Sequence, residues 1–181
     1  FHLDIIGDGE LRAETEALAV KYGLSDCVSF LGFQPPERVR SHMERADIFL
    51  FTSDRQEGWG AVANEAMNSA CALAADHMIG AVPYLVRDGE NGLVYQDGKP
   101  GRLFEAAEKL AGDRALCRKL GREAYRTITE VWNAENAAKR LLELIRTTAG
   151  LACGDGDPGV TGKGGYAPCA PAKILSERFR R

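Results

Sequence analysis

ADIFLFTSDRQEGWGAVANEAMNSACALAA, residues 46–75, holds two apolar runs with a polar loop and a helical pattern between them. The runs over 46–52 and 71–75 have the length and composition of buried strands. Residues 53–58 form the polar loop, and residues 60–70 continue as a predicted helix. Two strands joined through a helix lie parallel, because a parallel connection needs a crossover. The segment therefore predicts one unit of a parallel sheet.

The same alternation of strands and helices extends on both sides of this segment. On the N-terminal side we expect strands over 1–6 and 27–31, and helices over 10–22 and after Pro35-Pro36. On the C-terminal side the Asn91-Gly92 turn leads into a last strand over 93–95, and helices follow over 99–111, 113–130 and 133–147. This order predicts an α/β fold with a Rossmann-like, doubly wound parallel sheet, followed by C-terminal helices.

The composition changes after this region. Seven of the 20 glycines and three of the seven prolines lie in residues 148–181, with few large apolar side chains before Ile174. Such a segment cannot bury enough apolar surface to form a core. We therefore expect one folded domain over 1–147 and a Gly/Pro-rich, loosely packed tail over 148–181.

Charge and cysteine usage exclude several classes of protein. The net charge is -3, so no general electrostatic attraction to nucleic acid is expected, and no apolar run reaches the ~20 residues that cross a bilayer. The five cysteines lack metal-ligand spacing, and three of them fall in predicted strands or helices. This favours reduced, buried thiols and a cytoplasmic location.

The stretch that carries chemistry runs from Glu57 to Glu65, where two carboxylates are separated by seven residues. Glu57 lies in the loop and Glu65 within the predicted helix. Gly58 and Gly60 let the backbone approach a ligand closely, and the free N–H groups at the helix start attract a phosphate. This turn can hold a pyrophosphate without a metal ion.

The sequence resembles the second domain of retaining glycosyltransferases of family 4, which have two facing Rossmann domains (the GT-B fold; glycosyl transferases group 1). The matching motifs cover residues 1–147 in the family's order. They are Gly7-Asp8-Gly9, Val28-Ser29-Phe30-Leu31-Gly32, Ala46-Asp47-Ile48-Phe49-Leu50, the Glu57-x7-Glu65 element with Glu65-Ala66-Met67, Asp88-Gly89-Glu90-Asn91-Gly92-Leu93 and Trp132-Asn133. One departure is Pro83-Tyr84-Leu85, where the family often has an acidic residue after the proline. The departure leaves the sugar specificity open.

The resemblance implies a role for each residue of the stretch. Glu57 would contact a hydroxyl of the transferred sugar and act in catalysis, and Glu65 would hydrogen-bond the ribose. The donor nucleotide would also be bound by Gly58, Trp59, Gly60, Ala61 and Val62 at the diphosphate, and by Gly32 and Phe33 near the base. The implied partners are a nucleotide-sugar donor, most simply a UDP-sugar, and a glycan or lipid-linked acceptor. No metal and no cofactor are expected.

The resemblance also implies a missing part. The family's second domain opens with a further strand and helix that carry a diphosphate clamp, whereas this sequence begins at Phe1 within a strand-like run. In the doubly wound order 3-2-1-4-5-6 the absent strand is central. We therefore expect that no strand lies between the strands 1–6 and 46–52 within the sheet, which leaves a gap or an abnormal pairing there. We also expect no sugar transfer by this chain alone.

Several alternatives stay open at this point. A nucleotide-sugar epimerase of the same architecture would act without an acceptor, and a non-catalytic domain would bind UDP without turnover. Gly7-Asp8-Gly9 is followed by Arg12 instead of a third glycine, so we expect it to turn the chain and cap a helix.

Isolated side chains have structural interpretations as well. His42 and His77 lack a second metal ligand at useful spacing, but His77 follows a strand and could approach the sugar pocket. Trp132 is expected to anchor the last helix by packing instead of stacking on a sugar, because it is far from the glutamate loop in the sequence. The basic ending Arg178, Arg180 and Arg181 suits either a solvated tail or a protein peripheral at the inner membrane surface.

Overall fold

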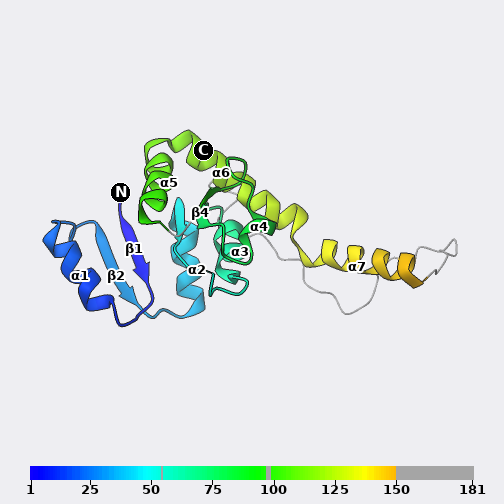
Figure 1. Cartoon of the computed structure of the whole chain (residues 1–181), viewed down its shortest axis with the longest axis horizontal. Coiled ribbons are helices and arrows are strands. Elements are labelled where there is room, and N and C mark those ends of the chain that lie inside the picture. The colour runs from blue at the N-terminus through cyan, green and yellow to red at the C-terminus, as the bar shows by residue number, and fades with distance from the viewer. Residues whose placement is uncertain (54, 97–98, 150–181) are drawn as a thin grey trace.

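The computed structural model describes residues 1–53, 55–96 and 99–149, and Figure 1 shows the chain. Helices and strands alternate, as expected from the sequence. The strands are β1 (Leu3–Ile6), β2 (Val28–Gly32), β3 (Ile48–Phe51), β4 (Ala72–Asp76) and β5 (Leu93–Tyr95). The helices are α1 (Arg12–Lys21), α2 (Pro36–Arg45), α3 (Ala61–Asn68), α4 (Val82–Leu85), α5 (Pro100–Gly112), α6 (Arg114–Arg126), the π-helix η1 (Thr127–Val131) and α7 (Ala134–Ala149).

The described strands form two separate parallel sheets. One sheet pairs β1 with β2, and the other has the order β3-β4-β5. The expected gap between the first and third strands is therefore confirmed, because β1 and β3 belong to different sheets. A hydrogen bond of 2.8 Å between His42 and Asp4 connects β1 to α2, which contacts α3 beside the three-stranded sheet.

The core surrounds β4, which is buried along its whole length. Its side chains alternate between two helical layers, as the period of a strand requires. Leu73 and Ala75 pack on the α3 side, whereas Ala72 and Ala74 face α5. Because both faces of β4 are covered, all of its side chains face apolar surroundings, and its sequence is therefore a nearly continuous apolar run.

The small residues of β4 let helices approach closely. Where α6 crosses the start of β4, a side chain at Gly121 would overlap the carbonyl group of Ala70. Met67, Leu110 and Leu120 fill the space on the two sides and are fully buried. Burying each of these side chains stabilises the fold by about 1.5–3 kcal/mol, so β4 and its helices form the stable centre of the chain.

A buried asparagine anchors the loop before β5. The predicted turn at Asn91-Gly92 is present, and Asn91 is only 4% exposed. Its side-chain amide donates to the Leu85 carbonyl and to the Thr127 hydroxyl, both at 2.9 Å, and its carbonyl oxygen accepts from Arg87 N at 2.7 Å. Asn91 thus ties this loop to both α4 and η1.

Some local predictions were wrong. No helix was predicted between residues 75 and 91, but the segment around Pro83 forms the short helix α4, because proline is tolerated in the first turn of a helix. Asp8 does not cap α1, which begins without a side-chain cap; it binds Arg12 at 3.1 Å instead. The end of the predicted helix over 113–130 is the π-helix η1.

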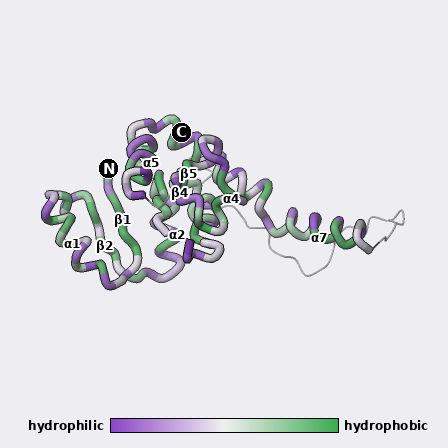
Figure 2. The backbone as a smooth tube through the Cα atoms, in the orientation of Figure 1, coloured by the Kyte–Doolittle hydropathy of each residue, from purple (hydrophilic) through white to green (hydrophobic). Residues whose placement is uncertain are grey.

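The last helix extends away from the body (Figure 1). Apolar and polar residues mix along α7 (Figure 2), and several large apolar side chains are exposed there: Leu141, Leu142, Leu144 and Ile145. The predicted tail over 148–181 and the basic ending lie almost entirely outside the described residues.

Candidate functional site

The Glu57–Glu65 stretch lies at the carboxyl end of β3, where ligands bind in doubly wound sheets. The helix α3 begins at Ala61 directly after Gly60, which has φ 79° and ψ 58°. A side chain at Gly60 would lie 2.8 Å from the Phe51 ring. Only glycine therefore allows the loop to turn into the helix at this point.

A second loop, after β4, holds the first one in place. A side chain at Gly80 would overlap the Gly58 carbonyl oxygen, so the two backbones touch. Ala81 N donates to the Trp59 carbonyl at 2.8 Å. These contacts with the loop after β4 hold the backbone of residues 58–60 in place.

The start of α3 is free to receive an anion. The helix has no side-chain cap and no acidic residue in its first turn. The first N–H groups of a helix lack partners within the helix and carry the positive end of its dipole. The expectation that Ala61 and Val62 present such groups therefore stands as a prediction for the diphosphate.

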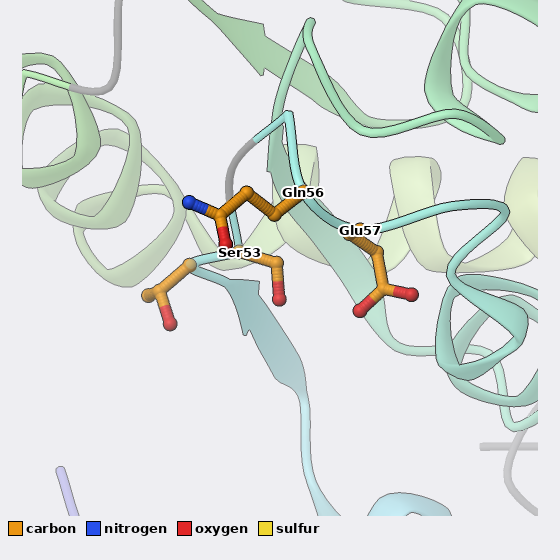
Figure 3. Close-up of a pocket in the computed structure, with 4 residues that line it drawn as sticks. Ser53, Gln56 and Glu57 are labelled. Carbon is orange, nitrogen blue, oxygen red and sulfur yellow. The ribbon is translucent and has the colours of Figure 1, made fainter.

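A pocket of about 360 Å³ opens beside the loop and is lined by Thr52, Ser53, Gln56 and Glu57. Figure 3 shows the Ser53 hydroxyl and the Glu57 carboxylate pointing to the same side of the loop. Glu57 is half-buried, whereas Glu65 is exposed on α3. Neither carboxylate forms a hydrogen bond or an ion pair with another described residue, so both can accept from a ligand.

The ends of the three strands of the larger sheet are connected. The Tyr95 hydroxyl donates to the Phe51 carbonyl at 2.9 Å, and His77 N donates to the Tyr95 carbonyl at 3.0 Å. Burial raises the pKa of Tyr95, and the nearby Asp76 carboxylate raises it further. The sequence analysis did not identify Tyr95, because a tyrosine at the end of a short apolar strand has no distinguishing pattern.

Aromatic rings gather at the outer side of the loop. Trp59 lies 5.9 Å from Tyr84 and 5.8 Å from Trp132, measured between ring centroids, and its indole N–H donates to the Asn64 side chain at 2.9 Å. Trp132 thus packs beside the glutamate loop, although the two are far apart in the sequence. The path of α6 and η1 brings it back to α3.

The residues expected near the base belong to the other sheet. Gly32 ends β2 with φ 63°, and Phe33 is 84% exposed. No hydrogen bond or ring contact among the described residues joins Phe33 to the glutamate loop. Their role in binding a base stays a prediction.

The described part of the chain holds neither a metal-ligand cluster nor a membrane-spanning helix. Within it, no three His, Cys, Asp or Glu side chains are grouped so that they could hold a metal ion. None of its helices is long and apolar enough to cross a membrane. Cys27, Cys71 and Cys117 form no disulfide with one another, and the last two are buried.

The family model for glycosyl transferases group 1 matches residues 1–127 of the chain. The chain belongs to this family. The match covers both sheets and the whole Glu57–Glu65 stretch, which confirms the resemblance to glycosyl transferases group 1.

Two curated relatives and one solved structure illustrate the similarity. An uncharacterized glycosyltransferase, MJ1178 of Methanocaldococcus jannaschii, is 34% identical over 121 residues, which cover 67% of this chain and 34% of the relative. The lipopolysaccharide core biosynthesis glycosyltransferase LpsE of Rhizobium meliloti is 28% identical over 144 residues, covering 80% and 41%. The chain thus spans less than half the length of these relatives.

The solved structure is Anabaena Alr3699/HepE in complex with UDP-glucose. Its TM-score is 0.65 at 22% identity, and the likeness covers 81% of this chain and 41% of that one. At this identity the likeness establishes the fold, which the chain shares with GT-B glycosyltransferases.

Proposed function

We propose that this chain is the donor-binding domain of a retaining glycosyltransferase that transfers a sugar from a UDP-sugar to a glycan or lipid-linked acceptor. The observation that carries the proposal is the arrangement of Glu57 and α3. A half-buried, unpaired carboxylate lines an open pocket, and an uncapped helix start follows it within four residues. The pocket suits a sugar, and the helix start suits the phosphates attached to it.

Each part of the arrangement has one task in this proposal. The amides of residues 59–62 bind the diphosphate, and Glu65, on the exposed side of α3, accepts hydrogen bonds from the ribose hydroxyls. Glu57 accepts from a hydroxyl of the sugar. The leaving diphosphate is stabilised by fixed dipoles that need not reorganise during the reaction, so no metal ion is required in this proposal.

The proposed acceptor and location rest on the name of one relative. LpsE is named for lipopolysaccharide core biosynthesis, which supports a lipid-linked or glycan acceptor. A cytoplasmic site of action, peripheral to the inner membrane surface in the complete protein, agrees with such an acceptor. The epimerase and the non-catalytic domain are less favoured, because no observation in the site supports either one over transfer.

The proposal is tested by binding of UDP to the 181-residue chain, measured by calorimetry or NMR titration. Glu65→Gln should reduce the affinity for UDP about tenfold, because charge-assisted hydrogen bonds to the ribose are worth about 1.5–3 kcal/mol. Glu57→Gln should leave UDP affinity unchanged within about twofold, because UDP lacks the sugar that Glu57 contacts. In a complete protein containing this chain, Glu57→Gln should instead reduce kcat.

Glu108→Gln is the matched control, because Glu108 is exposed on α5 and undergoes the same change of charge. It should leave UDP affinity unaltered. Absence of UDP binding to the wild-type chain, or equal losses in Glu65→Gln and Glu108→Gln, would contradict the proposed function.

A further inference from the structure

One pair of side chains near the site has no role in the function proposed above. Asp76 ends β4 and is 2% exposed, and its carboxylate oxygen Oδ1 accepts a hydrogen bond of 2.8 Å from Met78 N. The same oxygen lies 3.2 Å from Nδ1 of His77. This buried nitrogen has no hydrogen bond of good geometry among the described residues.

The two nitrogens of the His77 ring differ in their surroundings. The side chain is 42% exposed although Nδ1 is buried, so the Nε2 edge is the part that reaches solvent. A carboxylate next to Nδ1 favours the tautomer that carries its proton there. The neutral ring then presents Nε2 outward as a hydrogen-bond acceptor. A small rotation of the ring would align the Nδ1 proton with Asp76, as polar contacts often tighten only when a ligand is bound.

His77 lies at the same edge of the sheet as the Glu57 pocket. Phe51 of β3 is paired with Ala75 of β4, so the two strands end at this edge; Ser53 of the pocket follows β3, and His77 follows β4. Neighbouring strands lie about 4.8 Å apart. The loop that begins at His77 also packs on the backbone of the glutamate loop. The hydrogen bond from His77 N to the Tyr95 carbonyl keeps its backbone at the edge of the sheet.

We infer that His77 accepts a hydrogen bond from a hydroxyl of the transferred sugar, and that Asp76 is the positioning residue that orients the ring. This inference rests on the proposed function. A hydroxyl fits the Nε2 edge better than a phosphate does, because an acceptor nitrogen whose ring faces the Asp76 carboxylate would repel an anion. The diphosphate of the donor binds instead at the start of α3, which lacks acidic residues.

The first experiment compares binding of UDP and UDP-glucose to the 181-residue chain by NMR titration. His77→Ala should weaken UDP-glucose binding about fivefold, the contribution of one neutral hydrogen bond, and should leave UDP affinity within about twofold. His77→Gln should restore part of the loss, because its amide oxygen can accept from the same hydroxyl. His42→Ala, at the contact with β1, is the control and should change neither affinity.

The second experiment reads the tautomer directly from the ¹⁵N chemical shifts of the His77 ring. The wild-type chain should carry the proton on Nδ1, and Asp76→Asn should shift the population toward the Nε2 form. A ring that carries its proton on Nε2 in the wild-type chain would overturn the role of Asp76 and the acceptor at Nε2.

The outcomes separate this inference from the function beneath it. If UDP binds but His77→Ala weakens UDP and UDP-glucose equally, or neither, the sugar contact is refuted and the proposed function stands. If the wild-type chain binds neither ligand, the proposed function fails and this inference fails with it. Selective loss of UDP-glucose binding, restored in part by His77→Gln, supports the contact.

Discussion

Gly80→Ala should destabilise the chain and disturb the donor site at once. The added methyl carbon would overlap the Gly58 carbonyl oxygen and lie 2.9 Å from the carbonyl carbon and 3.3 Å from the Trp59 Cα. Carbon atoms in good contact are about 3.5–4.0 Å apart. The two backbones must therefore separate by about 1 Å.

Separating the two backbones lowers the free energy of unfolding. It breaks or lengthens the 2.8 Å hydrogen bond from Ala81 N to the Trp59 carbonyl, and it disturbs the packing of Gly60 on Phe51. Overpacking of this kind destabilises proteins by about 1–3 kcal/mol. We expect a loss of about 2 kcal/mol, because the clash is with backbone and cannot be relieved by a side-chain rotation.

Urea unfolding followed by tryptophan fluorescence measures this effect. With a slope of about 2 kcal/mol per molar, the midpoint should fall by about 1 M. UDP affinity should fall as well, because the amides of residues 59–62 are displaced from the positions proposed for the diphosphate. Gly101→Ala is the control: a side chain at this helical position meets nothing within 4 Å, so the midpoint should not fall.

The reasoning would be refuted if Gly80→Ala unfolded at the same urea concentration as the wild-type chain. That result would mean that the two loops are not held together by backbone contact. A fall in the midpoint for Gly101→Ala equal to that for Gly80→Ala would also contradict it.

Three other substitutions test the fold around the site. Asn91→Ala should destabilise the chain by about 2–3 kcal/mol in urea unfolding, because it leaves buried hydrogen-bonding groups without a partner, and a loss below about 1 kcal/mol would contradict this. Asp113→Ala should cost about 1 kcal/mol, since the carboxylate caps α6 by accepting from two backbone amides, and helicity by circular dichroism should fall at that helix. Tyr95 has a pKa raised by burial and by Asp76, so its stabilising effect is present below about pH 10 and is lost as the pH rises through the folded-state value. Tyr95→Phe should therefore flatten the alkaline part of the unfolding curve against pH, and an unchanged alkaline slope would disagree with the assignment.

The strands could be predicted from the sequence because each is a short apolar run bounded by glycine, proline or polar residues. The run over residues 71–75 was predicted as a buried strand, and the structure shows it covered by helices on both faces. The gap between the two sheets followed from the motif order and from the general strand order of doubly wound folds. The strands depend on local patterns that a single sequence contains, whereas the gap was implied by the family resemblance.

The contacts around the glutamate loop could not be predicted in the same way. Gly80 looks like any loop glycine, and only the backbone of Gly58 beside it explains why it has no side chain. Trp132 is far from Trp59 in the sequence, but the path of α6 and η1 brings the two rings together. Asp8 was expected to cap α1, although Arg12 offers it a charged partner instead. These contacts depend on which residues the folded chain brings together, and local sequence patterns do not contain that information.

The separation of the two sheets has a consequence for how the chain loses structure. The β1–β2 sheet and α1 bury only Ala19 deeply, whereas the β3-β4-β5 body contains most of the buried side chains. Regions with few buried apolar contacts open with lower free energy than the core does. Amides of β2 should therefore exchange with solvent deuterium long before those of β4. Unfolding should proceed in two steps, and a single melting temperature would describe only the second of them.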